Sequence, residues 1–182
     1  YRGEVVGEVA PGVEADLDMN GDRPPERPPW IPRRHPLNSH MPGGGTLATS
    51  STVTLTLGDL VIASASNFGT SGITSISDGT TNLTALTAIT GSADELRTFY
   101  FLSAPNAGAK TFTVTYVGTP TSRSIVVYVF TPSGTVTLDQ TAGQVNVGSS
   151  TAPSGNVTTT GTDELSFGTQ YNQNQTIGAP AN

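Results

Sequence analysis

Long stretches of this chain alternate apolar and polar residues, and this pattern constrains the fold more than any other feature. In residues 52–57 and again in residues 111–116, every second residue is apolar, and the residues between them are threonines. Successive side chains of a β-strand point to opposite faces of its sheet, so a period of two is typical of a half-buried strand. No stretch of the chain has the periodicity of a convincing amphipathic helix. The pattern therefore predicts an all-β fold.

Turn-forming residues divide these stretches at intervals of 8–14 residues, which favours two antiparallel sheets packed as a β-sandwich. Residues 124–130 form the most continuous apolar run and are the best candidate for a central strand. A short hairpin or edge is expected over residues 136–147. The other expected strands cover residues 52–57, 60–63, 73–76, 83–89, 95–102, 111–117, 157–160 and 164–168.

The composition agrees with a thin core. Hydrophobic residues make up 35% and charged residues 12% of the chain, and the remainder is rich in Thr, Ser, Gly and Asn. The net charge of −6 argues against a nucleic acid partner, because nucleic acid binding depends on clustered Lys and Arg. No apolar run approaches the length of a membrane span, and the first residues do not resemble a signal peptide, so no membrane association is expected.

Catalysis is not expected, because residues 43–182 contain neither histidine nor cysteine. That part of the chain lacks the usual general base near neutral pH, the usual thiol nucleophile and the best transition-metal ligands. Most of its acidic residues lie next to glycines or at expected strand starts, where carboxylates usually organise turns. We therefore predict a protein that is not an enzyme and that has no cofactor and no metal. These acids are Asp59, Asp78, Asp94, Glu95, Asp139, Asp163 and Glu164.

Residues 1–45 differ from the rest of the chain. Eight of the 13 prolines and five of the eight basic residues lie in the first 42 positions, with little periodicity. Repeated proline favours extended main chain, and such a segment cannot close a core of its own. Gly43, Gly44 and Gly45 then provide a joint. We predict an extended proline-rich arm or linker over 1–45 and a β-sandwich domain over 46–182.

One part of this arm combines the only tryptophan with an isoleucine and two adjacent arginines, and Trp and Arg are enriched at interface hot spots. We predict that it lies in a groove of another subunit and becomes ordered on binding. The alternative is a solvated tail or a remnant of cloning. The expected partner-binding residues are Pro28, Pro29, Trp30, Ile31, Pro32, Arg33 and Arg34.

Residues 16–22 match the first half of a calcium-binding loop, with oxygen ligands at alternate positions and a glycine for the turn. The match then fails, because Arg27 stands where the bidentate glutamate belongs and Pro24 and Pro25 deny the loop its following helix. An ordinary acidic turn is the preferred interpretation of Asp16–Asp22, and calcium binding is the alternative.

Six segments together resemble a recurrent domain. They are residues 58–62, 73–78, 99–101, 110–116, 122–127 and 163–168, and they are similar to segments of immunoglobulin-like domains of bacteriophage virion proteins and of secreted bacterial surface proteins. The resemblance covers roughly residues 50–170 and includes no catalytic signature. It implies an immunoglobulin-like antiparallel β-sandwich. In such domains further strands usually follow the segment at 163–168, so the C-terminal strands are either incomplete here or completed by a neighbouring chain.

The resemblance implies a structural protein of a bacteriophage virion, a capsid decoration protein or a head or tail accessory subunit anchored by its N-terminal arm. Such a protein would be located in the virion, an extracellular particle. Its partners would be other virion subunits (the major capsid or tail protein) and copies of itself, with a host-surface glycan as a further candidate. The lack of cysteine fits assembly in a reducing cytoplasm.

Two alternatives remain open. One is a secreted carbohydrate-binding or adhesive β-sandwich module, and the other is an appendage domain of a larger enzyme such as a tail depolymerase. A carbohydrate-binding module needs an exposed aromatic platform, but alternation places at least half of the aromatic residues in the core. Tyr171 and residues 172–175 are expected to be more exposed and able to contact a neighbour. The aromatic residues in question are Phe99, Tyr100, Phe101, Tyr116, Tyr128 and Phe130.

Overall fold

The structure is a computed structural model, and it describes residues 30–32, 37–42, 45–49, 51–69, 72–145, 155–161 and 163–171. For 30–32 and 37–42 it describes the main chain only. The described residues form β-strands and connecting segments, with no helix among them. The all-β fold predicted from the alternating pattern is therefore confirmed for this part of the chain.

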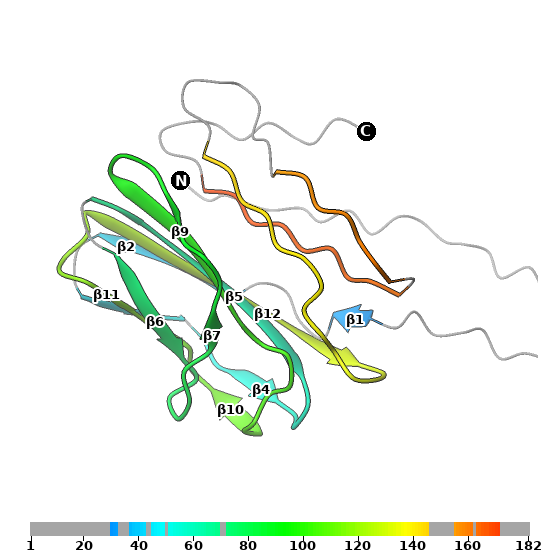
Figure 1. The fold of residues 1–182 in the computed structure, drawn as a ribbon. Coiled ribbons are helices and arrows are strands. Elements are labelled where there is room, and N and C mark those ends of the chain that lie inside the picture. Colours follow the sequence, from blue (N-terminus) through cyan, green and yellow to red (C-terminus); the bar gives the residue numbers. More distant parts are fainter. Residues whose placement is uncertain are drawn as a thin grey trace, which may run out of the picture.

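The strands form three antiparallel sheets (Figure 1). Their bounds are β1 Trp30–Pro32, β2 Leu37–Pro42, β3 Thr46–Ala48, β4 Val53–Leu55, β5 Leu60–Phe68, β6 Ile73–Ser77, β7 Thr84–Ala85, β8 Ile89–Thr90, β9 Asp94–Phe101, β10 Gly108–Lys110, β11 Thr113–Tyr116 and β12 Ser122–Pro132.

The largest sheet has seven strands, with β12 and β5 at its centre. On one side β12 pairs with β5, and β5 pairs in turn with β9, whose other edge carries the short strands β7 and β8. On its other side β12 pairs with β2 and β1, one after the other. The central position predicted for residues 124–130 is thus confirmed.

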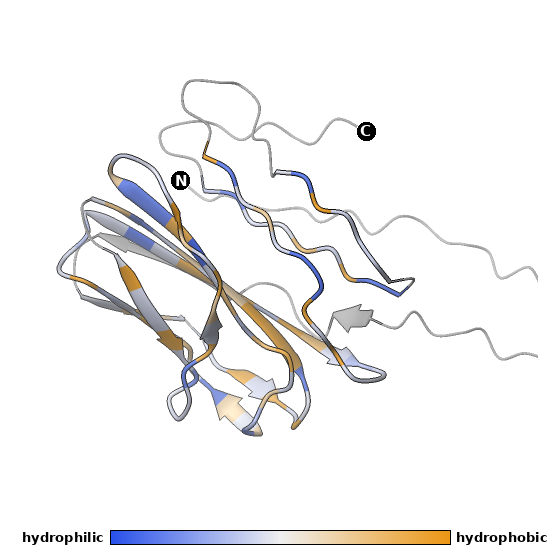
Figure 2. Ribbon diagram, in the orientation of Figure 1, coloured by the Kyte–Doolittle hydropathy of each residue, from blue (hydrophilic) through white to orange (hydrophobic). Residues whose placement is uncertain are grey.

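Two smaller sheets complete the core. One has the order β3-β11-β6 and the other pairs β10 with β4. Their apolar side chains meet those of the seven-stranded sheet in a single buried cluster, and the hydrophobic colouring concentrates on the strands in Figure 2. The largest side chains of this cluster are fully buried, as expected for a close-packed interior. They include Phe99, Phe112, Ile76 and Ile125.

The alternating pattern explains which side chains enter this core. In β11 Val114 and Tyr116 are buried, whereas the threonines between them are partly exposed. In β12 Ile125 and Val127 face the core, whereas Val126 and Tyr128 face the opposite side of the sheet. The prediction of strands from the alternating pattern is therefore correct for β11 and β12, because each strand has one face in the core and one outside it.

From residue 45 onward, three features of the described chain differ from the sequence prediction. Residues 83–89 were expected to form one strand, but two short strands occur there. The strands β3 and β10 were not expected, because three residues are too few to show a period. The described residues within 136–147, 157–160 and 164–168 form no strand, which corrects the prediction of a hairpin and two further strands.

These C-terminal residues nevertheless have a defined place. Segments 133–145, 155–161 and 163–171 run side by side along the seven-stranded sheet, drawn in yellow to orange-red in Figure 1. They make side-chain contacts with the sheet and with one another, which are described below. In 163–171 the alternation matches one half-buried face that forms without strand pairing, whereas in the other two segments Leu138, Val145 and Val157 are exposed.

Candidate interaction surface

The edge of β12 that lies opposite β5 is occupied by two pieces of the N-terminal segment. The six residues of β2 pair with Ser122–Val127, with Pro42 opposite Ser122 and Leu37 opposite Val127. The three residues of β1 pair with Phe130–Pro132. Antiparallel pairing of this kind is made by main-chain groups and depends little on side-chain identity. We refer to β1 and β2 together as the arm strands.

The predicted partner-binding residues are placed only in part. Trp30, Ile31 and Pro32 form β1, opposite Pro132, Thr131 and Phe130 in that order. The other four predicted residues, Pro28, Pro29, Arg33 and Arg34, lie outside the described residues, as does the calcium-like stretch Asp16–Asp22. The division of the chain into an arm over 1–45 and a domain over 46–182 stays a prediction.

Sequence reasoning missed the pairing of β2 with the chain's own β12. Residues 37–42 show no alternation and end at a proline, so no local pattern indicates a strand. The pairing is indicated by β12 instead. A central strand needs a neighbour on each side, and β5 supplies only one.

Buried polar groups fix the chain where the arm strands join the rest of the fold. The Arg123 guanidinium, on β12, donates a hydrogen bond to the carbonyl oxygen of Thr46 at the start of β3. The main-chain N–H of Tyr116 donates to the carbonyl oxygen of Gly45, with 2.8 Å between the two atoms. The fold is therefore anchored from Gly45, the last residue of the joint, onward.

The Tyr116 hydroxyl strengthens the same region from inside. It lies 3.3 Å from the carbonyl oxygen of Ser66 and 3.2 Å from that of Ser124, and these two acceptors share its single hydrogen. Burial raises the pKa of this hydroxyl far above its usual value, although the charge of Arg123 acts in the opposite direction. The hydroxyl therefore stays protonated and holds β5 and β12 together.

The outer face of the seven-stranded sheet carries an apolar row. Tyr100, Ile62 and Tyr128 lie opposite one another on β9, β5 and β12. Tyr100 and Tyr128 are half-buried, unlike the four other aromatic residues considered above, which are buried. Burial raises the pKa of Tyr128 above its usual value. The expectation that at least half of these aromatics belong to the core is therefore confirmed.

The segment 163–171 covers part of this row. The Phe167 ring packs edge-on against the Tyr128 ring, and the hydroxyl groups of Thr169 and Thr98 lie 3.4 Å apart. Tyr171 is half-buried, and its pKa is raised by burial and by the charge of Asp94, while a hydrogen bond with Ser122 lowers it. Tyr171 thus contacts the chain's own sheet.

The segments 133–145 and 155–161 are linked to each other by Asp139. One of its carboxylate oxygens accepts a hydrogen bond of 3.0 Å from the Thr160 N–H, and the other accepts one of 2.7 Å from the Thr160 hydroxyl. Glu164 likewise accepts a hydrogen bond from the Gly161 N–H. These carboxylates hold the main chain of exposed segments in place.

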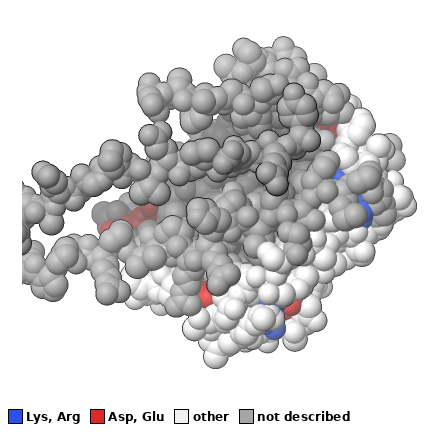
Figure 3. Space-filling view, turned by 180° about the vertical axis from the view of Figure 1, so that it is seen from behind, with Lys and Arg blue, Asp and Glu red and all other residues white. Residues whose placement is uncertain are grey.

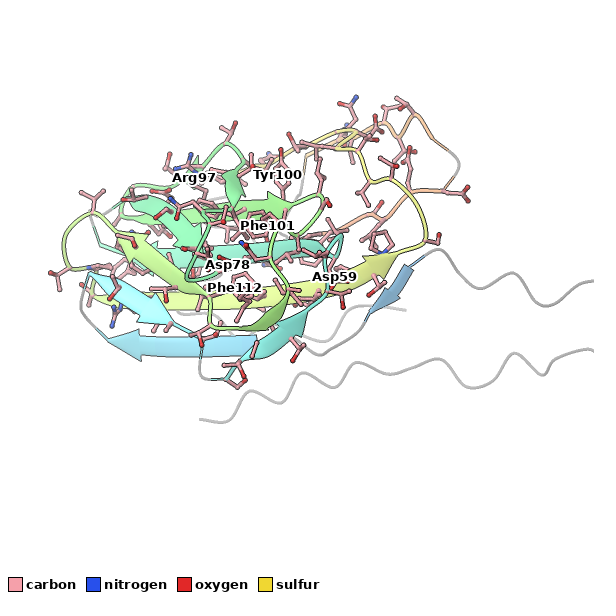
Figure 4. The ribbon with its side chains drawn as sticks, turned by 90° about the horizontal axis from the view of Figure 1, so that it is seen from below. Asp59, Asp78, Arg97, Tyr100, Phe101 and Phe112 are labelled. Carbon is pink, nitrogen blue, oxygen red and sulfur yellow. The ribbon has the colours of Figure 1, made fainter. Side chains whose placement is uncertain are left out.

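Asp59 and Asp78 are the most buried carboxylates of the described chain, and both organise turns. Asp59 accepts hydrogen bonds from the Thr56 N–H at 2.7 Å and from the Thr131 hydroxyl at 3.0 Å. Figure 4 shows it at the end of the sheet where β1 pairs with β12. Its contacts therefore tie the start of β5 to the end of β12.

Asp78 caps the turn after β6. One carboxylate oxygen accepts hydrogen bonds from the N–H groups of Thr80 and Thr81, at 2.8 and 2.6 Å. The other lies 3.2 Å from the Asn106 amide nitrogen and 3.6 Å from the Lys110 ammonium nitrogen. Burial alone would raise the pKa of Asp78, but these hydrogen bonds and the charge of Lys110 lower it below the usual value.

Glu95 also serves the main chain. Its carboxylate accepts a hydrogen bond of 3.2 Å from the Ile73 N–H, and its own N–H donates to the Asn67 side chain at 2.9 Å. Arg97, on the same strand, donates to the carbonyl oxygens of Leu86 and Ile73. Asp59, Asp78 and Glu95 are therefore turn and strand-end groups, as the sequence indicated, whereas Asp139 links two separate segments. The described residues include no group of three or more His, Cys, Asp or Glu arranged to hold a metal ion.

Charged side chains are sparse on the described surface. Figure 3 shows separate small groups of acidic and basic atoms on the described part of one face, without a continuous patch of either sign. Among the described residues, no helix has the length and apolar character needed to cross a membrane. The main-chain edge of β12 opposite β5 is covered by the arm strands along Ser122–Val127 and Phe130–Pro132.

Comparisons with protein-family models, with curated proteins and with solved structures found no match to this chain.

Proposed function

We propose that this chain is a structural protein of a bacteriophage virion, a capsid decoration protein or a head or tail accessory subunit, and that its N-terminal arm anchors it. In this proposal the three sheets belong to an immunoglobulin-like β-sandwich. The observation that supports the proposal is the pairing of β1 and β2 with the chain's own β12, because these residues add to a sheet edge in the way that an anchoring arm would.

Two further observations support a structural role over an enzymatic one. The carboxylates of Asp59, Asp78 and Glu95 accept hydrogen bonds from main-chain N–H groups at turns and strand ends, at 2.7, 2.6 and 3.2 Å respectively. The resemblance of six segments to immunoglobulin-like domains of virion proteins includes no catalytic signature. A protein of this kind works by being held in place, and the main-chain ladder of an extended arm is a suitable means.

The arm would act together with the two adjacent arginines that follow β1. Trp30 and Ile31 would bury apolar surface at a subunit boundary, while Arg33 and Arg34 would pair with acidic groups of a neighbour. Many copies on one particle would strengthen a modest affinity through a high effective concentration. The other partners would be the major capsid or tail protein, and a host-surface glycan is the candidate ligand of the exposed face.

Mass spectrometry of purified virions from the source culture tests this proposal. We expect peptides of this chain in density-purified particles, in a constant ratio to the major capsid protein. A Trp30→Ala/Arg33→Ala/Arg34→Ala variant should fold but lose particle association, and Leu57→Ala, at an exposed position far along the chain, is its matched control. Absence of the chain from particles that its host produces would overturn the proposal.

The second candidate is a secreted carbohydrate-binding or adhesive module. The observation that favours it is the half-buried pair Tyr100 and Tyr128 on the outer face of the sheet. Glycan-array binding that is lost in Tyr100→Ala, in a chain absent from virions, would favour this module over the virion subunit.

A further inference from the structure

We propose that the arm strands exchange between copies of this chain, so that β1 and β2 of one copy pair with β12 of a second copy. This inference rests on the proposed function, in which the arm anchors the subunit. It adds the partner, which is a second copy, and the receiving surface, which is the edge of β12 opposite β5.

The pairing of the arm strands points to this partner. In the described chain, β1 pairs with no strand except β12, and β2 likewise pairs with β12 alone. The arm strands therefore depend on the main-chain groups of Ser122–Val127 and Phe130–Pro132. Every copy of the chain carries the same groups in the same register, so a second copy offers the arm an equivalent edge.

The sequence at the joint permits the exchange. Gly43, Gly44 and Gly45 connect β2, in the seven-stranded sheet, to β3, in another sheet. Glycine has no Cβ and adopts main-chain angles that other residues avoid, so a change of direction here costs little. From Gly45 onward the fold is fixed by the hydrogen bonds of Tyr116 and Arg123, so the rest of the domain need not change.

The energy balance makes the exchange depend on concentration. The same ladder forms whether β12 belongs to the same chain or to another, so its contribution to the free energy nearly cancels between the two states. What remains is the entropy of association and the strain of the joint. We expect pairing within one chain in dilute solution and pairing between chains where copies are crowded, as on a particle.

Engineered cysteines test the inference, since the chain has none of its own. Asn38 and Val126 are register partners on β2 and β12, and such partners lie within the Cα distances that a disulfide spans. Full-length Asn38→Cys is mixed with full-length Val126→Cys, and the mixture is unfolded, refolded at increasing concentration and oxidised with glutathione. A disulfide between positions 38 and 126 then forms only between two copies.

The matched control replaces Val126→Cys by Ser124→Cys, because Ser124 is two residues out of register with Asn38 and pairs with His40. We expect the 38–126 disulfide to increase with concentration and to exceed the 38–124 disulfide at least fivefold at the highest concentration. The double variant Asn38→Cys/Val126→Cys should form the bond within one chain at low concentration, which verifies the register in the folded protein.

Equal yields of the 38–126 and 38–124 disulfides at every concentration would overturn the inference, and so would a double variant that forms no disulfide at all. The proposed function fails separately. If the chain is found in virions but only the intramolecular disulfide forms, the proposed function stands and strand exchange is wrong. If strands exchange between copies but the chain is absent from virions, strand exchange stands and the proposed function is wrong.

Discussion

The ring of Phe167 meets the ring of Tyr128 edge-on, with 4.9 Å between the ring centroids and 70° between the ring planes. Tyr128 lies on the outer face of β12, and Phe167 lies in the C-terminal segment that runs along this face. Edge-to-face pairs of this kind stabilise by about 0.5–1.5 kcal/mol beyond the burial of their surfaces. The pair therefore holds a segment that has no strand pairing in the described chain.

Replacing Phe167 with alanine should release this segment without unfolding the sheets. We expect the Phe167→Ala variant to lose about 1–2 kcal/mol in free energy of unfolding, because both the ring pair and part of the apolar burial disappear. The heteronuclear {1H}–15N NOE of residues 163–171, measured by NMR, should fall as the segment gains mobility, while that of β5 and β9 stays unchanged. The control is Leu138→Ala, at a side chain that is 46% exposed. The same NOE values in the two variants would contradict the proposed role of the ring pair.

Replacing a large side chain of the core should lower the free energy of unfolding much more than Phe167→Ala does. Phe112 is fully buried between the sheets, at 0% exposure, and Figure 4 labels it in the interior. We expect Phe112→Ala to cost about 3–5 kcal/mol, since it removes a large buried ring and leaves a cavity. Urea denaturation measures the loss, with Val117→Ala, at a 62% exposed side chain, as the control within about 0.5 kcal/mol of the wild type. A loss below 1 kcal/mol in Phe112→Ala would be inconsistent with this core.

Asp78 should make stability depend on pH in the acid range. Its pKa is lower in the folded chain than the ordinary value of 3.8, so its carboxylate adds stability above pH 3.8 and loses it as the pH falls through the folded pKa. At pH 7 the Asp78→Asn variant should be less stable than the wild type by about 1–3 kcal/mol, since the hydrogen bonds to the charged oxygens weaken. Urea denaturation from pH 7 to pH 2 should show this difference shrinking below pH 4. A difference that stays constant over the whole range would refute the assignment.

The strands with a clear period were predictable from the sequence. Val114 and Tyr116 alternate with threonines because one face of their strand is buried. The continuous apolar run at 124–130 indicated a central strand, because such a strand has little exposed surface. The turn role of Asp59 and Asp78 was predictable for a similar reason, since both are next to glycine in sequence. These features are local.

The remaining features depend on contacts that no local pattern encodes. Residues 37–42 join the sheet because β12 has a free edge for them. The hydrogen bond from Arg123 to the Thr46 carbonyl joins residues 77 positions apart. The alternation around Phe167 was visible in the sequence, but it corresponds to a half-buried face and not to a paired strand. The period of the apolar residues predicts which face of a segment is buried, but it does not predict which strand pairs with that segment.

The most direct test of the arm on the edge of β12 is residue-resolved hydrogen exchange, measured by NMR in the full chain and in a chain lacking residues 1–44. Successive N–H groups of β12 point alternately to β5 and to the arm strands. We predict that alternate N–H groups of residues 122–127 lose protection in the shortened chain, while their neighbours, and Ala63 and Phe99 in the β5–β9 ladder, keep it. Unchanged protection at every residue of 122–127 would contradict the account.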